Sequence, residues 1–304
     1  MTIASLAAQL PALDSHTPVL IAGPTACGKS TLALQIAQTY GGVVINADAI
    51  QVYGNLRCLT ARPSAQDEKL VPHRLYGHVA YDQPYSVGQW LRDVTALLSG
   101  ADRAIIVGGT GLYFQALTQG LAEIPPISPQ IMARCTQMLA TSGPQALIAD
   151  LDEATLAQID VHNPVRVQRA WQVLHGTGRG LADWQEATPP PVLRLQDSVP
   201  IVFDVGRDWV NLRIKTRFDS MIADGALDEI RTLLPVWSPD LPCAKAIGAP
   251  QLVAYLRDEI SLDSARTQAT IATQRFAKRQ RTWFRSKMAR WHGYTPSDDA
   301  RPMA

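Results

Sequence analysis

Eight consecutive residues near the start of the sequence have the composition of a phosphate-binding loop. They read Gly-Pro-Thr-Ala-Cys-Gly-Lys-Ser and match the pattern G-x-x-x-x-G-K-[ST] in full. Glycines let successive backbone N–H groups point at one anion, Lys29 adds a positive charge, and the Ser30 hydroxyl can hold Mg²⁺. The pattern predicts a diphosphate or triphosphate site with Mg²⁺ at Ser30, in which Cys27 contributes its backbone. The expected binding residues are Gly23, Thr25, Ala26, Cys27, Gly28, Lys29 and Ser30.

The residues that P-loop hydrolases place beside such a loop are replaced in this chain. The apolar run Ile105–Val107 leads into Gly108-Gly-Thr-Gly111, where a hydrolase usually has an Asp that holds Mg²⁺. A neutral Thr110 is poorly suited to hydrolysing a γ-phosphate. Its hydroxyl can, however, donate a hydrogen bond to a leaving diphosphate or to an acceptor. The motif therefore favours phosphate chemistry other than nucleotide hydrolysis.

An acidic residue follows a different apolar run. Val43–Ile45 is followed by Asn46-Ala-Asp48. In open α/β sheets the ligand crevice lies at the carboxyl ends of the strands, so we expect Asp48 to face the same crevice as Lys29. The alternative interpretation is a helix-capping or turn aspartate, since Asp is common at both positions.

The elements that must position these residues follow an alternating pattern. Short β-branched runs are separated by helical stretches, which predicts an α/β fold with a parallel, P-loop NTPase-like sheet flanked by helices. The expected strands are Val19–Ile21, Val43–Ile45, Ile105–Val107 and Ile201–Phe203. The expected helices include Ser30–Tyr40, Val87–Leu98, Trp209–Leu234 and Ser264–Trp291.

The strand pattern stops after about Gly120 and resumes after Pro191. Between them lie helical segments punctuated by proline, and Asn163-Pro164 has the form of a helix start. We therefore expect a catalytic core formed by residues 1–120 and 192–304, with a mostly helical insertion domain at residues 121–191.

The overall composition is that of an ordinary globular protein. Of its 304 residues 46% are hydrophobic and 18% are charged, and the formal net charge is +1. No apolar run is long enough to span a bilayer, and the first eighteen residues do not resemble a secretion signal. The four scattered cysteines show no metal-ligand spacing and fit a reducing compartment. We therefore expect a cytoplasmic protein with no membrane partner.

Motifs along almost the whole chain resemble the tRNA dimethylallyltransferase family in their order and spacing. The similarity covers about Pro18 to Trp291, and its first motif is the Gly23–Ser30 loop. Between them are Asn46-Ala-Asp-Ala-Ile-Gln-Val-Tyr53, Thr60-Ala-Arg-Pro63, Pro72-His73, Val107-Gly-Gly-Thr-Gly-Leu-Tyr113, His162-Asn-Pro-Val-Arg-Val-Gln-Arg-Ala170, Ala246-Ile-Gly248 and Ala272-Thr-Gln-Arg-Phe-Ala-Lys-Arg-Gln280.

The resemblance implies a reaction and roles for the candidate residues. A dimethylallyl group would pass from dimethylallyl diphosphate to the exocyclic N6 amine of the adenosine immediately 3′ of the anticodon in tRNA. Asp48 would be the general base, Thr110 would orient the acceptor or the diphosphate, and Arg217 would act on the leaving group. Arg213, four residues before Arg217, would bind the diphosphate. The alternative for this arginine pair is a solvated salt-bridge face.

The anticodon stem-loop of tRNA would be the partner of a further group of residues. The stretch Arg275–Arg290 has seven Lys or Arg and no acid, with Trp283 and Phe284 interleaved, a composition that favours phosphate contact over a merely solvated face. The insertion domain would hold the anticodon stem. The expected tRNA-binding residues are Asp48, Ala49, Ile50, Gln51, Arg166, Gln168, Arg169, Lys278, Arg279 and Arg281.

Four departures from the family pattern and three rival functions stay open. Asn55-Leu-Arg-Cys-Leu-Thr60 differs from the usual Gly-Leu-Asp-Ile-Gly-Thr run, and Gln274-Arg275 reverses the order of the usual Arg-Gln pair. Ala49 stands where the family usually has Ser, and Ala249-Pro250 replaces a Tyr-Lys type pair, which puts rate and substrate contacts in doubt. A P-loop kinase of a small metabolite would share the loop and Asp48. A prenyltransferase of free adenine nucleotides would share the chemistry, and a non-catalytic RNA-binding protein would share the basic helix. We expect a monomer.

Overall fold

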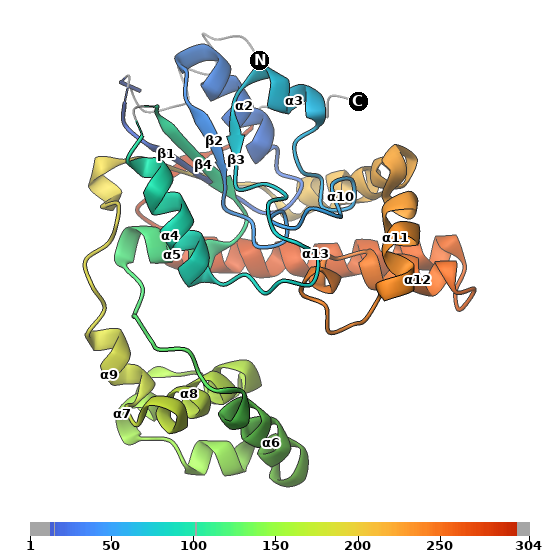
Figure 1. Cartoon of the computed structure of the whole chain (residues 1–304). Helices are drawn as coiled ribbons and strands as arrows, with labels where there is room; N and C mark the ends of the chain where they lie inside the picture. Colours follow the sequence, from blue (N-terminus) through green and yellow to red (C-terminus); the bar gives the residue numbers. More distant parts are fainter. Residues whose placement is uncertain (1–12, 15, 101, 297–304) are drawn as a thin grey trace. The chain divides into compact units, whose positions relative to one another are not determined.

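The computed structural model describes residues 13–14, 16–100 and 102–296 (Figure 1). The expectation of no secretion signal rests largely on residues 1–12, which lie outside the described part. The chain divides into two compact units, residues 1–118 with 193–304 and residues 119–192.

The larger unit is built on a six-stranded parallel sheet with the order β3-β2-β4-β1-β5-β6. Four of the strands are the expected ones, β1 (Val19–Ala22), β2 (Val43–Asn46), β4 (Ala104–Gly108) and β5 (Val199–Phe203), and their parallel pairing confirms the predicted fold class. The other two, β3 (His73–Arg74) and β6 (His292–Tyr294), pair at the edges and were not expected. Both are too short to show a two-residue period.

Helices cover both faces of this sheet, and successive residues of β1 point into two different cores. Val19 and Ile21 pack with α2 (Lys29–Tyr40), whereas Leu20 packs with α4 (Val87–Leu98) and α5 (Gly111–Gln119). A strand buried on both faces reads as a continuous apolar run, which is the signal that predicted a parallel sheet.

The prediction of one continuous helix over Trp209–Leu234 is wrong. The chain forms α10 (Arg207–Met221), a π-helical turn at Ile222–Ala226 and α11 (Leu227–Leu233). Gly225 has φ 112°, a conformation open to glycine and strained for other residues, and it breaks the ladder of hydrogen bonds. A third apolar cluster joins α11, α12 (Ala249–Leu256) and the segment from Val52 to Leu59.

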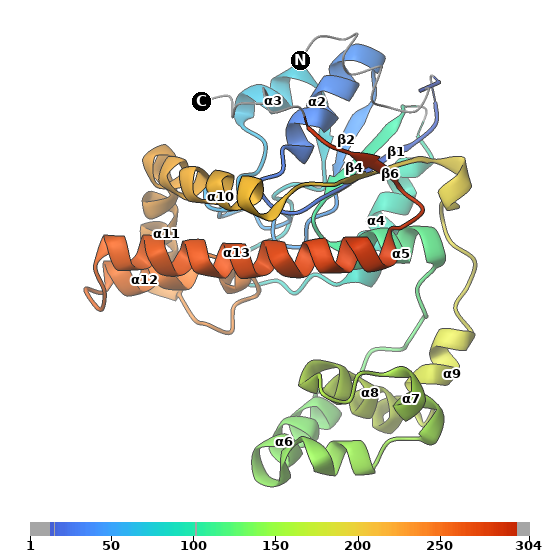
Figure 2. The same cartoon turned by 180° about the vertical axis from the view of Figure 1, so that it is seen from behind.

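The C-terminal helix α13 (Leu262–Lys287) ends four residues before the expected Trp291 and is followed by β6. It lies beside α10 (Figure 2), and residues from both helices enter the same core. α3 (Ala65–Leu70) completes the larger unit, with short 3₁₀ turns at Leu195–Asp197, Leu234–Val236 and Pro242–Lys245.

The smaller unit is helical throughout its described elements, which are α6 (Pro129–Ala149), α7 (Glu153–Gln158), α8 (Pro164–Thr177) and α9 (Leu181–Glu186). Asn163 caps α8 and accepts hydrogen bonds from the N–H groups of Val165 and Arg166, which confirms the predicted helix start. The buried side chains of Leu147, Val167 and Trp171 form a core of their own. This unit thus has the apolar interior of a small independent helical domain.

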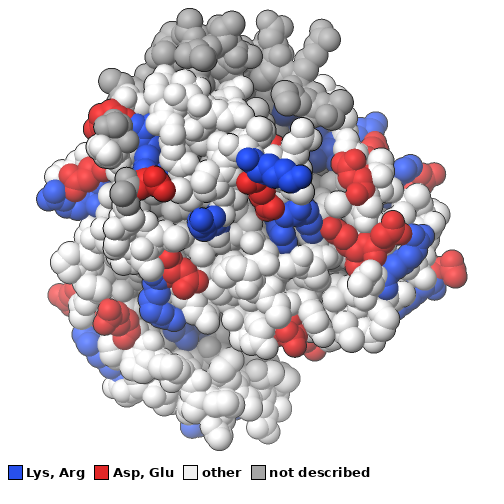
Figure 3. All heavy atoms as spheres, turned by 45° about the horizontal axis from the view of Figure 1, so that its top comes forward, with Lys and Arg blue, Asp and Glu red and all other residues white. Residues whose placement is uncertain are grey.

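Charged side chains of both signs are interspersed on the face in Figure 3. This pattern agrees with the net charge of +1, so an RNA partner would have to be bound by local clusters of cations. Within the described residues, no helix has the length and hydrophobicity needed to cross a membrane.

Candidate active site

The Gly23–Ser30 segment, here called the lysine loop, turns sharply between β1 and α2. Gly28 has φ 92° and precedes the first turn of α2, and a glycine brings no side chain to occupy the N–H groups of that turn. A Cβ at Gly23 would lie 2.7 Å from Cys27 Sγ and 2.9 Å from Phe203 Cβ, so only glycine fits there. No side chain caps the start of α2, which is compatible with an anion bound there. Burial raises the pKa of the Cys27 thiol, which supports a packing role for that side chain.

Two arginines of α10 contact the lysine loop. Arg213 Nε donates to the carbonyl oxygen of Ala26 at 2.8 Å, and its guanidinium lies over the Trp209 ring at 4.6 Å from the ring centroid. Arg217 Nη1 lies 3.3 Å from Thr25 Oγ1, to which it donates. Burial lowers the pKa of both guanidinium groups. Arg213 supports the backbone of the loop, whereas Arg217 brings positive charge to its open side.

Asp48 is fixed by a turn at the end of β2. The buried Asn46 side chain accepts a hydrogen bond from the Asp48 N–H at 2.8 Å and donates to the Asp48 carbonyl oxygen at 2.9 Å. Asp48 Oδ1 in turn accepts from the Ile50 N–H at 3.0 Å. Asp48 is therefore a turn residue, as the alternative interpretation predicted. The same aspartate also lines a pocket, so the two interpretations do not compete.

Thr110 belongs to the segment Gly108–Gly111, here called the threonine loop, which packs against the turn that holds Asp48. Its Oγ1 accepts a hydrogen bond from the Ala49 N–H at 2.9 Å, and its own N–H donates to the Ala47 carbonyl oxygen at 3.1 Å. Because Oγ1 already accepts from a backbone group, its proton is available for donation. A Cβ at Gly108 would lie 2.0 Å from the Ala47 oxygen, so this contact requires glycine.

Gln280 of α13 joins the two loops and was missed by the sequence analysis. Its Oε1 accepts from the Thr25 N–H at 2.9 Å, and its Nε2 donates to the Gly109 carbonyl oxygen at 2.9 Å. Gln280 is the last residue of the motif Ala272–Gln280, but it lies inside a run of basic residues, and this pattern alone does not distinguish a buried glutamine from a solvated one.

A pocket of roughly 360 Å³ opens where these groups meet. Its polar lining includes Thr25, Asp48, Thr110 and Arg217, and two further cations, Lys245 and Arg279, also line it. Its apolar lining comes from α10, α13 and two loop regions, and it was also missed because residues far apart in sequence form it. These residues are Ile50, Leu59, Ile214, Phe218, Met221, Ile247 and Phe276. A pocket with anion-binding groups at one side and an apolar wall suits a ligand with a charged head and a hydrocarbon tail.

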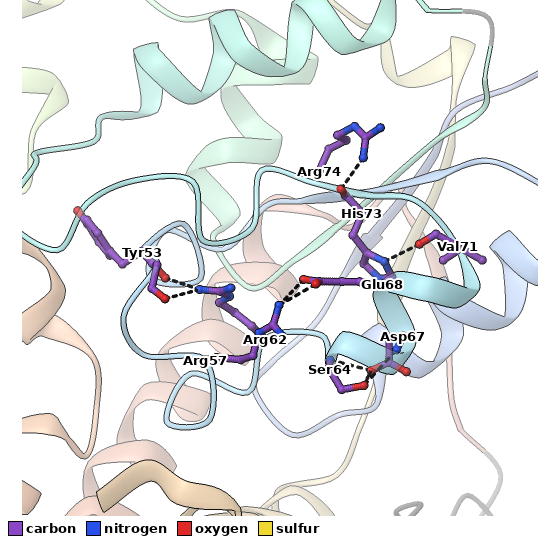
Figure 4. Close-up of polar contacts among 10 residues, drawn as sticks. Tyr53, Arg57, Arg62, Ser64, Asp67, Glu68, Val71, His73 and Arg74 are labelled. Atoms are coloured by element: carbon purple, nitrogen blue, oxygen red, sulfur yellow. Dashed lines mark hydrogen bonds and ion pairs between the residues drawn. The ribbon is translucent and has the colours of Figure 1, made fainter. Parts of the chain in front are cut away.

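Hydrogen bonds from side chains to backbone hold the segment that forms one wall of this pocket. Gln51 Nε2 donates to the carbonyl oxygens of Thr60 and Ala61 at 2.9 and 3.0 Å. Figure 4 shows Arg62 donating to the Tyr53 carbonyl oxygen, and Arg62 also donates to the Gly54 carbonyl oxygen. In the same view Arg57 pairs with Glu68 at 2.7 Å, which connects the segment to α3. The wall that carries Ala49 to Gln51 is thus tied at several points.

Comparisons with known proteins agree with this site. Residues 51–287 match the family model described as IPP transferase, and residues 17–77 match that described as Isopentenyl transferase. A tRNA dimethylallyltransferase from Cereibacter sphaeroides is 56% identical over 93% of this chain and 90% of its own length. The chain belongs to the IPP transferase family. A tRNA dimethylallyltransferase from a Ruegeria species is 54% identical over 93% of this chain and 97% of its own length.

Solved structures of similar proteins place the fold in the same family. The full-length tRNA isopentenylpyrophosphate transferase from Bacillus halodurans has a TM-score of 0.65 and 28% identity, over 93% of this chain and 90% of its own. A eukaryotic dimethylallyltransferase acting on tRNA has a TM-score of 0.77 at 23% identity, over 92% of this chain and 73% of its own. The latter likeness concerns the fold alone. The family resemblance drawn from the motifs is confirmed.

In this IPP transferase family member, the residues expected to bind tRNA fall on different surfaces. Asp48, Ala49, Ile50, Gln51 and Arg279 line the pocket. Lys278 and Arg281 line a separate groove of roughly 420 Å³ between α10 and α13. In the smaller unit Arg166 and Arg169 are exposed on α8, whereas Gln168 is half-buried. Their contact with RNA stays a prediction.

A divalent cation fits this site as a companion of a bound diphosphate. Ser30 is exposed in the first turn of α2. Among the described residues, no three or more His, Cys, Asp or Glu side chains gather as metal ligands. Mg²⁺ typically keeps several waters and is held by few protein groups together with substrate phosphates, so a single hydroxyl beside the cradle is compatible with it.

Proposed function

We propose that this chain transfers a dimethylallyl group from dimethylallyl diphosphate to the N6 amine of the adenosine immediately 3′ of the anticodon in tRNA. The observation that carries the proposal is the pocket in which Thr25, Arg217, Asp48 and Thr110 lie beside an apolar wall. An anion cradle, a positive charge, a carboxylate and a hydroxyl donor are the groups that displacement of a diphosphate by an amine requires.

The diphosphate would bind at the lysine loop, with Lys29 and the N–H groups at the start of α2 as its partners. Arg217 would neutralise charge that grows on the leaving oxygen as the allylic C–O bond breaks. Mg²⁺ held by Ser30 and the diphosphate oxygens would supply further neutralisation of the leaving group. The five-carbon tail would lie against the apolar wall, where Phe218 and Met221 contribute large side chains. Such a wall excludes water, which would otherwise compete for the allylic carbon.

The acceptor adenine would enter from the side of Asp48. Its N6 forms the new bond to the allylic carbon, the diphosphate leaves with the electron pair of the broken C–O bond, and the N6 proton passes to Asp48. The Thr110 Oγ1 accepts from the Ala49 N–H through a lone pair, and its O–H would donate to the adenine ring or to the diphosphate. A base inside a folded anticodon loop must first be extruded into the pocket.

The remaining parts of the proposal concern the partner, the state of the protein and its location. The smaller unit would hold the anticodon stem, which the exposed Arg166 and Arg169 on one helix support. All four cysteines are free, which supports a cytoplasmic, reducing location. The protein would act as a monomer, and its elution volume in size-exclusion chromatography tests that expectation.

The decisive experiment offers three acceptors to purified protein with Mg²⁺ and labelled dimethylallyl diphosphate. They are an unmodified anticodon stem-loop with adenosine 3′ of the anticodon, AMP, and buffer alone. Label should enter the stem-loop only, and Asp48→Ala should abolish this transfer. Asp240→Ala, which removes an exposed carboxylate outside the pocket, is the matched control and should transfer at the wild-type rate.

Three results would contradict the proposal. Label on AMP but not on the stem-loop would indicate a prenyltransferase of free nucleotides. Consumption of added ATP with a small metabolite, without prenyl transfer, would indicate a kinase. Stem-loop binding without turnover of either compound would indicate a non-catalytic RNA-binding protein.

A further inference from the structure

Gln280 differs from its neighbours on α13 in burial and in bonding. Lys278 and Arg279, directly before it, are exposed, and Arg281 is half-buried, whereas Gln280 is only 6% exposed. Both ends of its carboxamide are used, the oxygen by the Thr25 N–H and the nitrogen by the Gly109 carbonyl, each at 2.9 Å. A primary amide both donates and accepts through one rigid planar group, which a carboxylate or a thioether cannot do.

The two hydrogen-bond partners of Gln280 belong to two different loops, one next to the expected diphosphate and one next to the expected adenine. Thr25 belongs to the lysine loop after β1, and Gly109 belongs to the threonine loop after β4, the neighbour of β1 in the sheet. The lysine loop would hold the diphosphate, and the threonine loop is packed against the turn that carries Asp48. One carboxamide thus connects the donor side of the pocket to its acceptor side.

The space around Gly109 shows how closely Gln280 approaches the acceptor side. A Cβ at Gly109 would lie 2.4 Å from Gln280 Nε2 and 3.4 Å from Asp48 Oδ2. The carboxamide and the Asp48 carboxylate therefore both lie near the position that this Cβ would occupy. Even one methyl group at this position would push the carboxamide away from the Gly109 carbonyl.

Resting on the proposed function, we propose that Gln280 is a positioning residue that sets the distance between the diphosphate loop and the loop that orients the adenine. It acts through Thr25 and Gly109 and need not touch either substrate. Because the Thr25 N–H is committed to Gln280, Thr25 offers only its hydroxyl to the diphosphate. Thr25 is therefore an exception to the expectation that the residues of the lysine loop bind the diphosphate through their backbone N–H groups.

The reaction is sensitive to this distance because two bonds change at one carbon. In-line displacement requires the leaving oxygen and the attacking nitrogen on opposite sides of the allylic carbon at the same time. Misplacement of reacting groups by about 1 Å can cost about 10²-fold in rate, even when both substrates still bind. Loss of Gln280 should therefore lower kcat and leave the affinity for RNA nearly unchanged.

Gln280→Met and Gln280→Glu test the proposal. Methionine has nearly the same length and neither amide group, whereas glutamate keeps the acceptor for Thr25 but loses the donor for Gly109. The matched control is Gln268→Met, an exposed glutamine on the same helix whose amide bonds only Ser264. Each protein is assayed with labelled dimethylallyl diphosphate and the anticodon stem-loop, and its folding is checked by circular dichroism and thermal melting.

We expect kcat of Gln280→Met to fall about 10²-fold while the KM for the stem-loop changes less than about threefold. Gln280→Glu should lose a comparable factor, and Gln268→Met should match the wild type. A raised KM for RNA at unchanged kcat would make Gln280 an RNA contact and overturn the proposal, as would wild-type kinetics in both variants. If the wild type itself transfers no label, the proposed function fails, and that failure is visible before any variant is compared.

A second variant keeps the test decisive if Gln280→Met does not fold. Gly109→Ala leaves Gln280 unmutated but displaces its carboxamide, since the new Cβ would lie 2.4 Å from Nε2, whereas Asp48 Oδ2 would be 3.4 Å away, close to an ordinary contact. The same pattern is expected, a lower kcat with little change in the KM for the stem-loop. Normal kcat in this variant would overturn the proposal.

Discussion

Removal of the Arg217 charge should affect the reaction more than removal of any other cation on α10. The variant Arg217→Gln keeps a polar side chain of similar reach but removes the guanidinium whose Nη1 lies 3.3 Å from Thr25 Oγ1. The guanidinium lines the pocket beside the lysine loop. A diphosphate oxygen bound at this loop would lie about 4 Å from that charge, where two unit charges interact by about 4 kcal/mol near a protein surface.

This energy sets the size of the expected effect. Each 1.36 kcal/mol is a factor of ten in rate, so the full interaction corresponds to about 10³-fold. Water entering the pocket of the variant would screen the remaining groups and recover part of the loss. We therefore expect kcat/KM for dimethylallyl diphosphate to fall about 10²- to 10³-fold, with most of the loss in kcat because charge on the leaving oxygen grows as the bond breaks.

Single-turnover transfer of label to the anticodon stem-loop measures the chemical step directly. Lys215→Gln is the control, since Lys215 is an exposed cation on the same helix that does not line the pocket. Its rate should stay within about twofold of the wild type, because exposed charges contribute little. A loss below about fivefold in Arg217→Gln, or an equal loss in the control, would refute the assignment of Arg217 to the leaving group.

Three further predictions concern the two loops and the thiols. Gly108→Ala should abolish prenyl transfer, because its Cβ would lie 2.0 Å from the Ala47 carbonyl oxygen. The control Gly293→Ala has open space around the new Cβ and should be active. Normal transfer by Gly108→Ala would contradict the close packing of the threonine loop against Ala47. Burial raises the pKa of all four thiols, so less thiolate forms at pH 8 than in a free cysteine. Even the half-buried Cys58 should therefore react with iodoacetamide several times more slowly in the native protein than in the urea-unfolded protein, which mass spectrometry can measure. Equal reaction rates in the two states would contradict this prediction. Ser30→Ala should raise the Mg²⁺ concentration for half-maximal transfer about tenfold in a titration, and an unchanged midpoint would exclude the hydroxyl as a ligand.

The sequence predicted the parts of the fold that depend on local pattern. β1 and β4 are buried on both faces and therefore read as apolar runs, and Asn163 lies at the start of α8 as its residue type predicts. The edge strands β3 and β6 have two and three residues, too few for a period to appear. Gly225 lies inside an otherwise helical sequence pattern, so the sequence predicted one continuous helix, whereas the positive φ of Gly225 separates α10 from α11.

The candidate site also contains residues that local sequence pattern could predict and residues that it could not. Asp48 and Thr110 each follow a buried strand and line the pocket, because the carboxyl ends of neighbouring parallel strands meet at one edge of the sheet. Lys29 follows β1 but does not line this pocket, and its contact with a diphosphate stays a prediction. The apolar wall and Gln280 could not be found by this argument. They come from α10, α13 and loop residues far apart in sequence, which only tertiary packing brings together. The position of a glutamine among arginines does not show whether its side chain is buried or exposed.

The contact between Thr25 and Gln280 spans 255 residues of sequence, and this separation bears on how the protein is made. Synthesis at about 5–20 residues per second leaves roughly 13–50 seconds between the emergence of these two residues from the ribosome. During that interval the nascent chain has the lysine loop but not the helix that holds it against its neighbour. Loops closed by distant contacts form late, because the entropy of closing the intervening chain must be offset first. Translation that stops before α13 would thus release a chain with an intact phosphate-binding motif and an unfinished site.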